Sequence, residues 1–488
     1  MSLKKKTRFA FFWSALERVG NQGLMFAIQI LLARLIAPEE FGLLALLVIF
    51  TTLCQLVVDG GFTQAIIQSK EISRLDVSSV FFVNIFLSLL IYGILFFAAP
   101  YIASFYGEPR LVLLTRVLSL NLVISSFGQI QNGLLVRNLQ FKKLFYISTP
   151  AIVISGVVGV VMALQGFEVW ALVGARFASR LVSTTCYWFM SDRSYWPRFE
   201  FSVGSVKRLG SFGLGMLGTS LLYHGTQNIY GLLIGKAFSV ETLAFYNRAR
   251  SFHKQPSSAL TKVLNRVLFP VFSGIQDEDA RIRNALKKGM PTLAFIICPA
   301  MIWLTLAPNE LITVLLTEKW IRSADLMMFF PIIGIFFTFT AVQSSVIRAK
   351  GRAALFFWTS IIKSVFAISV LIYTVQFNAM VVVLGQVIVS ICINVFINMP
   401  LCQYVCGYSV RDQIQDIGPS LFCSLMAGAI SKTSVTLMEL NSDLLILFLV
   451  TLIFIVSYFL LTKLLGMKQT DMVTNQLRRF QLLKFATQ

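Results

Sequence analysis

The sequence predicts an all-α integral membrane protein, and composition, hydropathy and the length of its apolar runs lead to this prediction. Of its 488 residues, 56% are hydrophobic and 13% are charged, with a mean hydropathy of +0.76, whereas soluble chains carry roughly 25% charged residues. Apolar runs of about 18–25 residues recur along the whole chain, each long enough to cross a bilayer core. Because hydrocarbon offers the backbone no water, each run is expected to close its hydrogen bonds internally as a helix.

In chain order the apolar runs number about fourteen, each long enough to span a core of roughly 30 Å. The first six cover residues 11–36, 41–67, 80–105, 111–136, 145–164 and 169–189. The next six cover residues 209–234, 243–272, 290–316, 326–347, 355–375 and 380–404, and the last two cover 417–435 and 444–465. An even number of crossings would return the carboxyl terminus to the side of the amino terminus.

An internal repeat predicts two pseudo-symmetric lobes of six helices. Residues 31–42 align with residues 233–244, each at the junction of the first and second runs of a half. The matched positions pair Arg34 with Lys236, Glu39 with Glu241 and, more weakly, Gln131 with Gln343. Six crossings would set both copies in the same orientation. Some transporters are built from such parallel repeats and bind their substrate between the two halves. The alternative is chance similarity between apolar helices.

The repeat predicts three parts of the chain. They are an amino-terminal lobe at residues 1–206, a carboxyl-terminal lobe at residues 207–408, and two extra helices with a basic cytoplasmic tail at residues 409–488.

Basic residues collect in alternate loops, and this predicts the orientation. With the amino terminus inside, inner segments hold about 26 Lys and Arg residues and outer segments about five, and these residues favour short cytoplasmic loops. Both termini are therefore expected to be cytoplasmic. The same distribution accounts for the net charge of +20 through orientation and contact with anionic lipid headgroups. We expect membrane lipids as partners and no nucleic acid.

The eighth run carries more charge than a lipid-facing helix could bear, since a charge at the bilayer centre costs several kcal/mol unless it faces a partner or a wet cavity. Its basic residues are Arg248, Arg250, His253, Lys254, Lys262 and Arg266. Steps of four from Arg250 form a stripe on one side of a helix, which predicts one wall of a cavity. Pro256 removes a backbone hydrogen bond and predicts a hinge. Alternatively, Lys262 and Arg266 extend to the cytoplasmic interface.

Polar residues in three other runs extend this predicted cavity. They are Thr219, Tyr223, His224, Gln227 and Asn228 in the seventh run, Arg18, Gln22 and Gln29 in the first, and Thr52, Gln55 and Asp59 in the second. A cationic cavity predicts an anionic cargo, such as a lipid with a pyrophosphate headgroup that Arg and Lys could hold. The expected substrate-binding residues are Arg18, Gln22, His224 and the six basic residues of the eighth run.

Asp59, His224 and His253 are candidates for coupling transport to a proton or sodium ion, since titratable groups within a membrane often serve as relays. Each has a structural alternative: Asp59 would cap a helix or form an ion pair, and each histidine would pack with a hydrogen bond. The seven cysteines are expected to pack in apolar runs, because none has the neighbours of a metal site. We expect no metal, no cofactor and no catalytic residue.

Four segments resemble a known family. They are residues 33–46 (ARLIAPEEFGLLAL), 59–73 (DGGFTQAIIQSKEIS), 266–278 (RVLFPVFSGIQDE) and 317–320 (TEKW). They are similar to the polysaccharide transporters of the multidrug/oligosaccharidyl-lipid/polysaccharide (MOP) exporter superfamily, especially Wzx-type O-antigen flippases and colanic-acid exporters. The resemblance covers essentially the whole chain. The first three segments together are fairly specific, whereas TEKW alone is weak.

The resemblance implies a bacterial inner-membrane flippase that works by alternating access, driven by an ion gradient. Its cargo would be an oligosaccharide repeat unit on undecaprenyl pyrophosphate, delivered for lipopolysaccharide O-antigen, capsule or exopolysaccharide. A polysaccharide polymerase and chain-length machinery are the implied protein partners. The family offers no residue motif for its sugar, so the cavity residues above rest on charge and spacing alone.

Two other functions stay open. A drug or metabolite exporter of the same superfamily would share the architecture, but an exporter of cationic drugs should favour an acidic lining. A membrane-embedded glycosyltransferase or polysaccharide polymerase is the enzyme alternative. The sequence shows no nucleophile with a base and an orienting group, and no Gly-rich phosphate loop, so we expect that the protein is not an enzyme.

Overall fold

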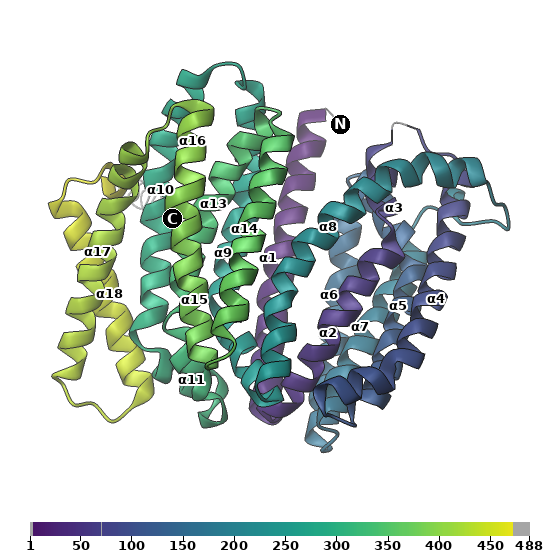
Figure 1. Cartoon of the computed structure of the whole chain (residues 1–488), viewed down its shortest axis with the longest axis horizontal. Coiled ribbons are helices and arrows are strands. Elements are labelled where there is room, and N and C mark those ends of the chain that lie inside the picture. Colours follow the sequence, from purple (N-terminus) through teal and green to yellow (C-terminus); the bar gives the residue numbers. More distant parts are fainter. Residues whose placement is uncertain (1–2, 70, 472–488) are drawn as a thin grey trace, which may run out of the picture. The chain divides into compact units, whose positions relative to one another are not determined.

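The computed structural model describes residues 3–69 and 71–471. Within these ranges, it leaves out the side chains at positions 3–12, 14–19, 219, 223, 262–263, 265–267, 269–271 and 353. The described backbone consists of helices joined by short turns and contains no β-strand, so the predicted fold class is confirmed (Figure 1).

The chain forms two compact units, residues 1–244 (unit 1) and residues 245–488 (unit 2). Unit 1 contains α1 (Leu3–Leu35), α2 (Pro38–Asp59), α3 (Phe62–Gln68), α4 (Arg74–Tyr106), α5 (Leu111–Arg137), α6 (Phe141–Leu164), α7 (Val169–Met190) and α8 (Val203–Ala237). Helix α9 (Val240–Gly274) begins in unit 1 and continues into unit 2.

Unit 2 contains α10 (Asp279–Leu306), α11 (Pro308–Leu316), α12 (Arg322–Met327), α13 (Phe330–Ala349), α14 (Ala353–Thr374), α15 (Ala379–Cys392), α16 (Met399–Cys406), α17 (Val410–Thr436) and α18 (Asp443–Leu464). A π-helical segment, Ile393–Asn398, joins α15 to α16. Each predicted run coincides with a helix or with two consecutive helices. Nine helical segments of the described chain are long and apolar enough to span a membrane, and the count of fourteen crossings stays a prediction.

The boundary between the units follows α8 rather than the predicted lobe boundary at residues 206/207. Helix α8 packs on α2 and α3 through glycines, which let two backbones approach closely. A Cβ on Gly61 would overlap the carbonyl of Gly213, and one on Gly235 would overlap the side chain of Leu46. The described contacts therefore place α8 with unit 1, while the repeat boundary stays a prediction.

Small and polar residues hold the helices of unit 1 together. The Asn21 amide of α1 donates to the Ser148 hydroxyl of α6 at 2.7 Å and accepts from Thr149 at 2.9 Å. Gly156 of α6 lies against Ile28 of α1. Such contacts are typical of membrane helices, where apolar association gains little over lipid.

In unit 2 the last two helices pack on α10. The Tyr458 hydroxyl of α18 donates to the Phe295 carbonyl at 3.0 Å, and the Trp303 indole donates to the Thr451 hydroxyl at 3.0 Å. The Ser431 hydroxyl of α17 donates to the Val450 carbonyl of α18 at 2.7 Å. Helices α17 and α18 therefore share the core of unit 2.

Large apolar side chains cover much of the outer surface of both units. Phe97, Phe189 and Phe396 are 76%, 84% and 74% exposed, respectively. Water would disfavour such a surface, whereas hydrocarbon accommodates it. The chain is a multi-pass α-helical membrane protein.

Candidate functional site

The basic residues of α9 differ in burial. Arg248 is buried, and its guanidinium carbon lies 4.8 Å from the centre of the Trp320 ring. His253 is also buried, with its ring stacked on Phe330 at 5.2 Å and an interplanar angle of 7°. Arg250 is half-buried and Lys254 is exposed. In unit 2, Arg248 and His253 thus pack among aromatic rings, whereas Arg250 and Lys254 are more accessible.

Two of the predicted cavity residues, Arg248 and His253, have contacts with these aromatic rings. The ring stack packs His253 in the core, but its Nδ1 has no hydrogen-bond partner among the described residues, so the hydrogen-bonded packing role and the cavity role both stay predictions. Arg248 has an aromatic partner in the core that the sequence did not predict, since a guanidinium over an indole gains cation–π energy. Both contacts favour structural roles for these two side chains.

The other predicted site residues are distributed as follows. Gln22 of α1 and His224 of α8 are half-buried. The side chains of Arg18, Lys262 and Arg266 lie outside the described residues, so their roles stay predictions. Pro256 is exposed, and the helical assignment of α9 continues through it from Val240 to Gly274. The predicted hinge therefore also stays a prediction.

In unit 1 a chain of hydrogen bonds runs between α2 and α5 and ends on Asp59. The Ser125 hydroxyl donates to the Gln55 amide at 2.7 Å, and Gln55 donates to Gln129 at 3.3 Å. The Gln129 amide donates to the Asp59 carboxylate, which also accepts from the Thr63 hydroxyl. Every amide and hydroxyl in this chain donates toward Asp59, an arrangement that stabilises negative charge at its end.

These contacts refine the structural alternatives for Asp59. The Thr63 backbone N–H lies 3.4 Å from the carboxylate, so Asp59 contributes weakly to the first turn of α3. Among the described residues, Asp59 has no ion pair within 4 Å; amides and hydroxyls surround it instead. A carboxylate with this environment can exchange a proton or hold a cation, and its coupling role stays a prediction.

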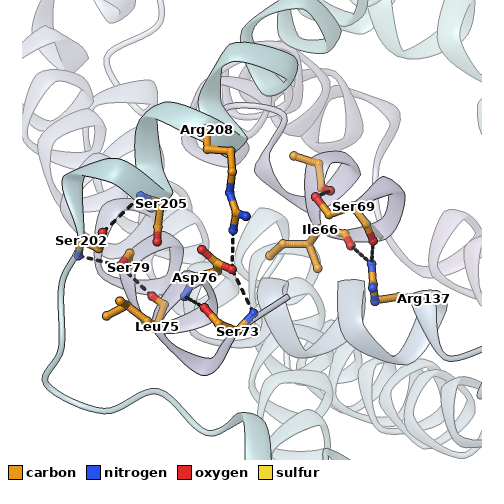
Figure 2. Close-up of polar contacts among 11 residues, drawn as sticks. Ile66, Ser69, Ser73, Leu75, Asp76, Ser79, Arg137, Ser202, Ser205 and Arg208 are labelled. Carbon is orange, nitrogen blue, oxygen red and sulfur yellow. Dashed lines mark hydrogen bonds and ion pairs between the residues drawn. The ribbon is translucent and has the colours of Figure 1, made fainter. Parts of the chain in front are cut away.

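A second polar cluster lies where α8 begins against α4, at the expected cytoplasmic end of unit 1. The guanidinium of Arg208 contacts the Asp76 carboxylate at 2.6 Å, and the Asp76 side chain is 3% exposed. Asp76 and Ser73 also form a reciprocal cap at the start of α4. Figure 2 shows Arg208 directed from α8 toward Asp76, and the Ser79 hydroxyl accepting from the Ser202 backbone N–H at 2.9 Å.

Arg208 is one of the basic residues of the expected inner segments. The structure gives it a nearly buried anionic partner, so it also joins two helices. In the same view Arg137 donates to the carbonyls of Ile66 and Ser69, which closes the end of α3 (Figure 2). The carbonyls at a helix end need such donors because they have no partner within the helix.

Arg110, on the expected outer side, is paired in the same manner. It contacts the carboxylate of Glu39 and that of Glu40, the latter at 2.9 Å. Partial burial acts to lower the pKa of Arg110, but the two carboxylates outweigh it and raise the pKa above its usual value. This pairing reduces the local positive charge at one of the few basic positions of the outer set.

Two arginines of unit 1 are not among the residues that the sequence predicted to line a cavity. Arg176 and Arg180 lie on α7, inside the sixth run, and both are exposed. Their spacing of four residues within an apolar run could have revealed them by the argument that singled out the eighth run.

A neutral polar network in unit 2 was also missed. Gln343 of α13 donates to Gln413 of α17 at 2.9 Å. Asn394 and Asn398 of the π-helical segment each donate to the Thr340 hydroxyl, at 3.1 and 2.9 Å. All four amide residues are buried, so this network specifies how the three segments pack. Short π-helical segments often mark functional positions.

The described residues contain no group of three or more His, Cys, Asp or Glu side chains that could hold a metal ion. The seven cysteines are free thiols, all buried or half-buried. The expectation that this protein uses neither metal nor cofactor stays a prediction.

Comparisons with known proteins indicate a common family. The family model described as polysaccharide biosynthesis protein matches residues 31–325 of this chain. The lipopolysaccharide biosynthesis protein WzxC of Escherichia coli (strain K12) is 27% identical over 430 residues, which cover 87% of each chain. The succinoglycan biosynthesis transport protein ExoT of Rhizobium meliloti (strain 1021) is 27% identical, over 72% of this chain and 71% of its own. The teichuronic acid biosynthesis protein TuaB of Bacillus subtilis (strain 168) is also 27% identical, over 78% and 79%.

Solved structures share the fold. The lipid II flippase MurJ, in an inward closed conformation, aligns over 93% of this chain and 98% of its own, with 14% identity and a TM-score of 0.75. An inward-facing multidrug resistance transporter of the MATE family, within the MOP superfamily, aligns over 79% and 98%, with 19% identity and a TM-score of 0.58. At these identities the likeness concerns the fold alone.

Proposed function

This chain belongs to the polysaccharide biosynthesis protein family, and on that premise we propose that it moves an undecaprenyl-pyrophosphate-linked oligosaccharide repeat unit across the bacterial inner membrane. The cargo would serve the synthesis of a surface polysaccharide: lipopolysaccharide O-antigen, capsule or exopolysaccharide. A polymerase and chain-length machinery would act on it after transport. Both termini of the transporter would be cytoplasmic.

The observation that carries this proposal is the position of Arg250 and Lys254 on α9. Arg250 is half-buried and Lys254 is exposed, while Arg248 and His253 of the same helix are buried against aromatic rings. Two basic side chains one turn apart on α9 suit an anionic cargo. A pyrophosphate headgroup is such an anion, and a guanidinium binds phosphate with two parallel hydrogen bonds.

Energy for transport would come from an ion gradient, with Asp59 as the coupling group. Its carboxylate lies in unit 1 among donors that can stabilise charge, and protonation or cation binding there would change the hydrogen bonds between α2, α3 and α5. A proton and a sodium ion are both compatible with these contacts.

A drug or metabolite exporter is the second candidate, because the MATE transporter shares the fold. The charge of Arg250 and Lys254 favours the transport of a lipid-linked oligosaccharide, because an exporter of organic cations would need carboxylates in its binding site. We propose no enzymatic activity.

Deleting the gene in its native host tests the proposal. We expect loss of one surface polysaccharide and accumulation of repeat units on undecaprenyl pyrophosphate in the inner leaflet, identified by mass spectrometry of extracted lipids. Persistence of the polymer with altered drug sensitivity would support the exporter instead. Repeat units that reach the outer leaflet without polymerising would indicate the enzyme alternative.

Complementation of this deletion then tests the role of Arg250 and Lys254 in transport. The Arg250→Ala/Lys254→Ala variant is expected to restore no polymer while inserting and folding normally, because neither side chain is fully buried. Lys288→Ala, which removes an exposed charge in the first half of α10, is the control and should complement fully. Full complementation by the double variant would contradict a role of Arg250 and Lys254 in transport.

A further inference from the structure

Arg176 and Arg180 lie on the side of α7 that faces α5. The Thr184 hydroxyl donates to the Ile124 carbonyl of α5 at 3.2 Å, and Gly128 of α5 faces Thr184 and Tyr187. Positions 176, 180, 184 and 187 follow steps of four, four and three residues, so they share one face of the helix. The two guanidinium groups therefore belong to the face of α7 that contacts the protein.

The opposite face of α7 is apolar and exposed. Leu181 is 51% and Phe189 is 84% exposed. At about 100° per residue, Phe189 lies roughly opposite both arginines, and Leu181 lies about 100° from Arg180 and about 140° from Arg176. This is the face that lipid would cover. Arg176 and Arg180 are themselves exposed, so α5 does not fill the space beside them.

Neither arginine has an ion pair or a hydrogen bond from its guanidinium among the described residues. Other arginines of unit 1 are held: Arg208 by Asp76, Arg110 by Glu39 and Glu40, and Arg116 by the Phe96 carbonyl at 3.3 Å and the Phe96 ring at 4.3 Å. Two like charges one turn apart also repel each other. Arg176 and Arg180 thus raise the energy of the described protein unless an anion joins them.

In the predicted repeat, the run that contains Arg176 and Arg180 corresponds to residues 380–404, which contain no Lys, Arg, Asp or Glu. They include Asn394 and Asn398, whose amides pair with Thr340 inside unit 2. The arginine pair therefore belongs to unit 1 alone, as expected of a ligand site rather than of a repeated packing element.

We propose that Arg176 and Arg180 bind the pyrophosphate of the lipid-linked cargo, with one guanidinium on each phosphoryl group. This inference rests on the proposed function and names the element of unit 1 that holds the headgroup. Side chains one turn apart have Cβ atoms about 5–6 Å apart, so the two guanidinium groups can converge on adjacent phosphoryl groups. A monophosphate would fully satisfy only one guanidinium group, so the pair selects pyrophosphate over monophosphate.

Lipid binding by the purified full-length protein in detergent tests this pair. The probes are undecaprenyl pyrophosphate and undecaprenyl phosphate, and the Kd of each is measured by thermophoresis. We expect wild type to prefer the pyrophosphate. Arg176→Gln/Arg180→Gln should weaken its binding by at least about tenfold per arginine, the equivalent of one charge-assisted hydrogen bond each, and should abolish the preference. Arg176→Lys/Arg180→Lys should retain part of it.

Arg116→Gln is the matched control, since it removes the same charge from unit 1 but from a side chain that already has partners. We expect its affinity for the pyrophosphate to equal that of wild type. An equal loss in Arg116→Gln would show that net charge alone matters and would overturn the proposal.

The remaining outcomes are also decisive. Wild-type affinity in the double Gln variant would overturn the arginine pair and leave the proposed function intact. Failure of wild type to bind either lipid, with polymer intact in the deletion strain, would remove the proposed function and this inference with it. If the Gln and Lys variants all fail to fold, as judged by size-exclusion chromatography, the pair is structural and the proposal is wrong.

Discussion

Asp59 lies at the end of an apolar helix, and its surroundings decide what it can do. The sequence identified it as a candidate for ion coupling but left a cap or an ion pair as alternatives. The structure shows a carboxylate that accepts from Thr63 and Gln129 and that has no ion pair among the described residues. The donors were not predictable, because Gln129 lies 70 positions away on another helix.

Asp59→Asn separates the charge of this side chain from its packing. The amide oxygen can still accept from Thr63 and Gln129, so we expect the free energy of unfolding to change by less than about 1 kcal/mol. Transport into membrane vesicles should no longer respond to an imposed proton or sodium gradient. Thr63→Ala, which keeps the carboxylate, is the control and should retain the response. An unchanged response in Asp59→Asn would remove Asp59 from the coupling mechanism.

Arg248 and Arg250 show where residue-level reasoning reaches its limit. The density of charge in the eighth run was evident from the sequence. Two positions apart on a helix are about 200° apart around its axis, so these residues point to opposite sides. Nothing local decides which of the two is buried; Trp320, more than 70 positions further along, does so by packing on Arg248.

At the scale of elements, the packing of α8 on α3 depends on two glycines. Gly61 has a φ of +73° and lies against the backbone of Gly213. The sequence motif at residues 59–73 contained Gly60 and Gly61, but their partner on α8 could not be predicted from it.

Gly61→Ala should be far more destabilising than Gly107→Ala. Both glycines have positive φ values, +73° and +72°, and the space beside Gly107 is open. The φ strain alone costs about 1 kcal/mol or somewhat more, and we expect this from Gly107→Ala. Gly61→Ala adds an overlap with the α8 backbone and should cost at least about 3 kcal/mol. Thermal unfolding in detergent measures both, and equal shifts in Tm would show that α8 does not constrain Gly61.

The contact between α8 and α4 makes a second prediction at this scale. Arg208→Gln leaves the Asp76 carboxylate nearly buried without its cation, which should cost about 1–2 kcal/mol because Arg208 itself is largely in solvent. Its exposed neighbour Lys207 provides the control, Lys207→Gln, with a smaller effect expected. Adding Asp76→Asn to Arg208→Gln should recover part of the loss, as measured by Tm. If Arg208→Gln and Lys207→Gln behave alike, the ion pair contributes nothing to stability.

At the scale of the whole molecule, the alternation of basic loops makes a topological prediction. A green fluorescent protein fused to the carboxyl terminus should fluoresce, because both termini are expected in the cytoplasm. Alkaline phosphatase fused after Gly166, in the turn between α6 and α7, should be active, because this turn is expected on the outer side. Activity of the phosphatase at the carboxyl terminus instead would reverse the proposed orientation.

The sequence by itself determined the class of this protein, its helices and its family. Apolar runs of this length have one solution in a membrane, because a helix satisfies all of its backbone groups within the segment. Each run therefore predicts its own structure without knowledge of any other. The resemblance to polysaccharide transporters was likewise confirmed, because it rested on contiguous segments.

Only the tertiary structure decided which polar residues meet and which are buried. It joined Ser125, Gln55 and Gln129 to Asp59, placed Arg248 under Trp320, and set α8 against α3 and α4. The physical reason is that the spacing of residues on a helix fixes which side chains share a face, while the neighbours of that face come from segments far away in the chain.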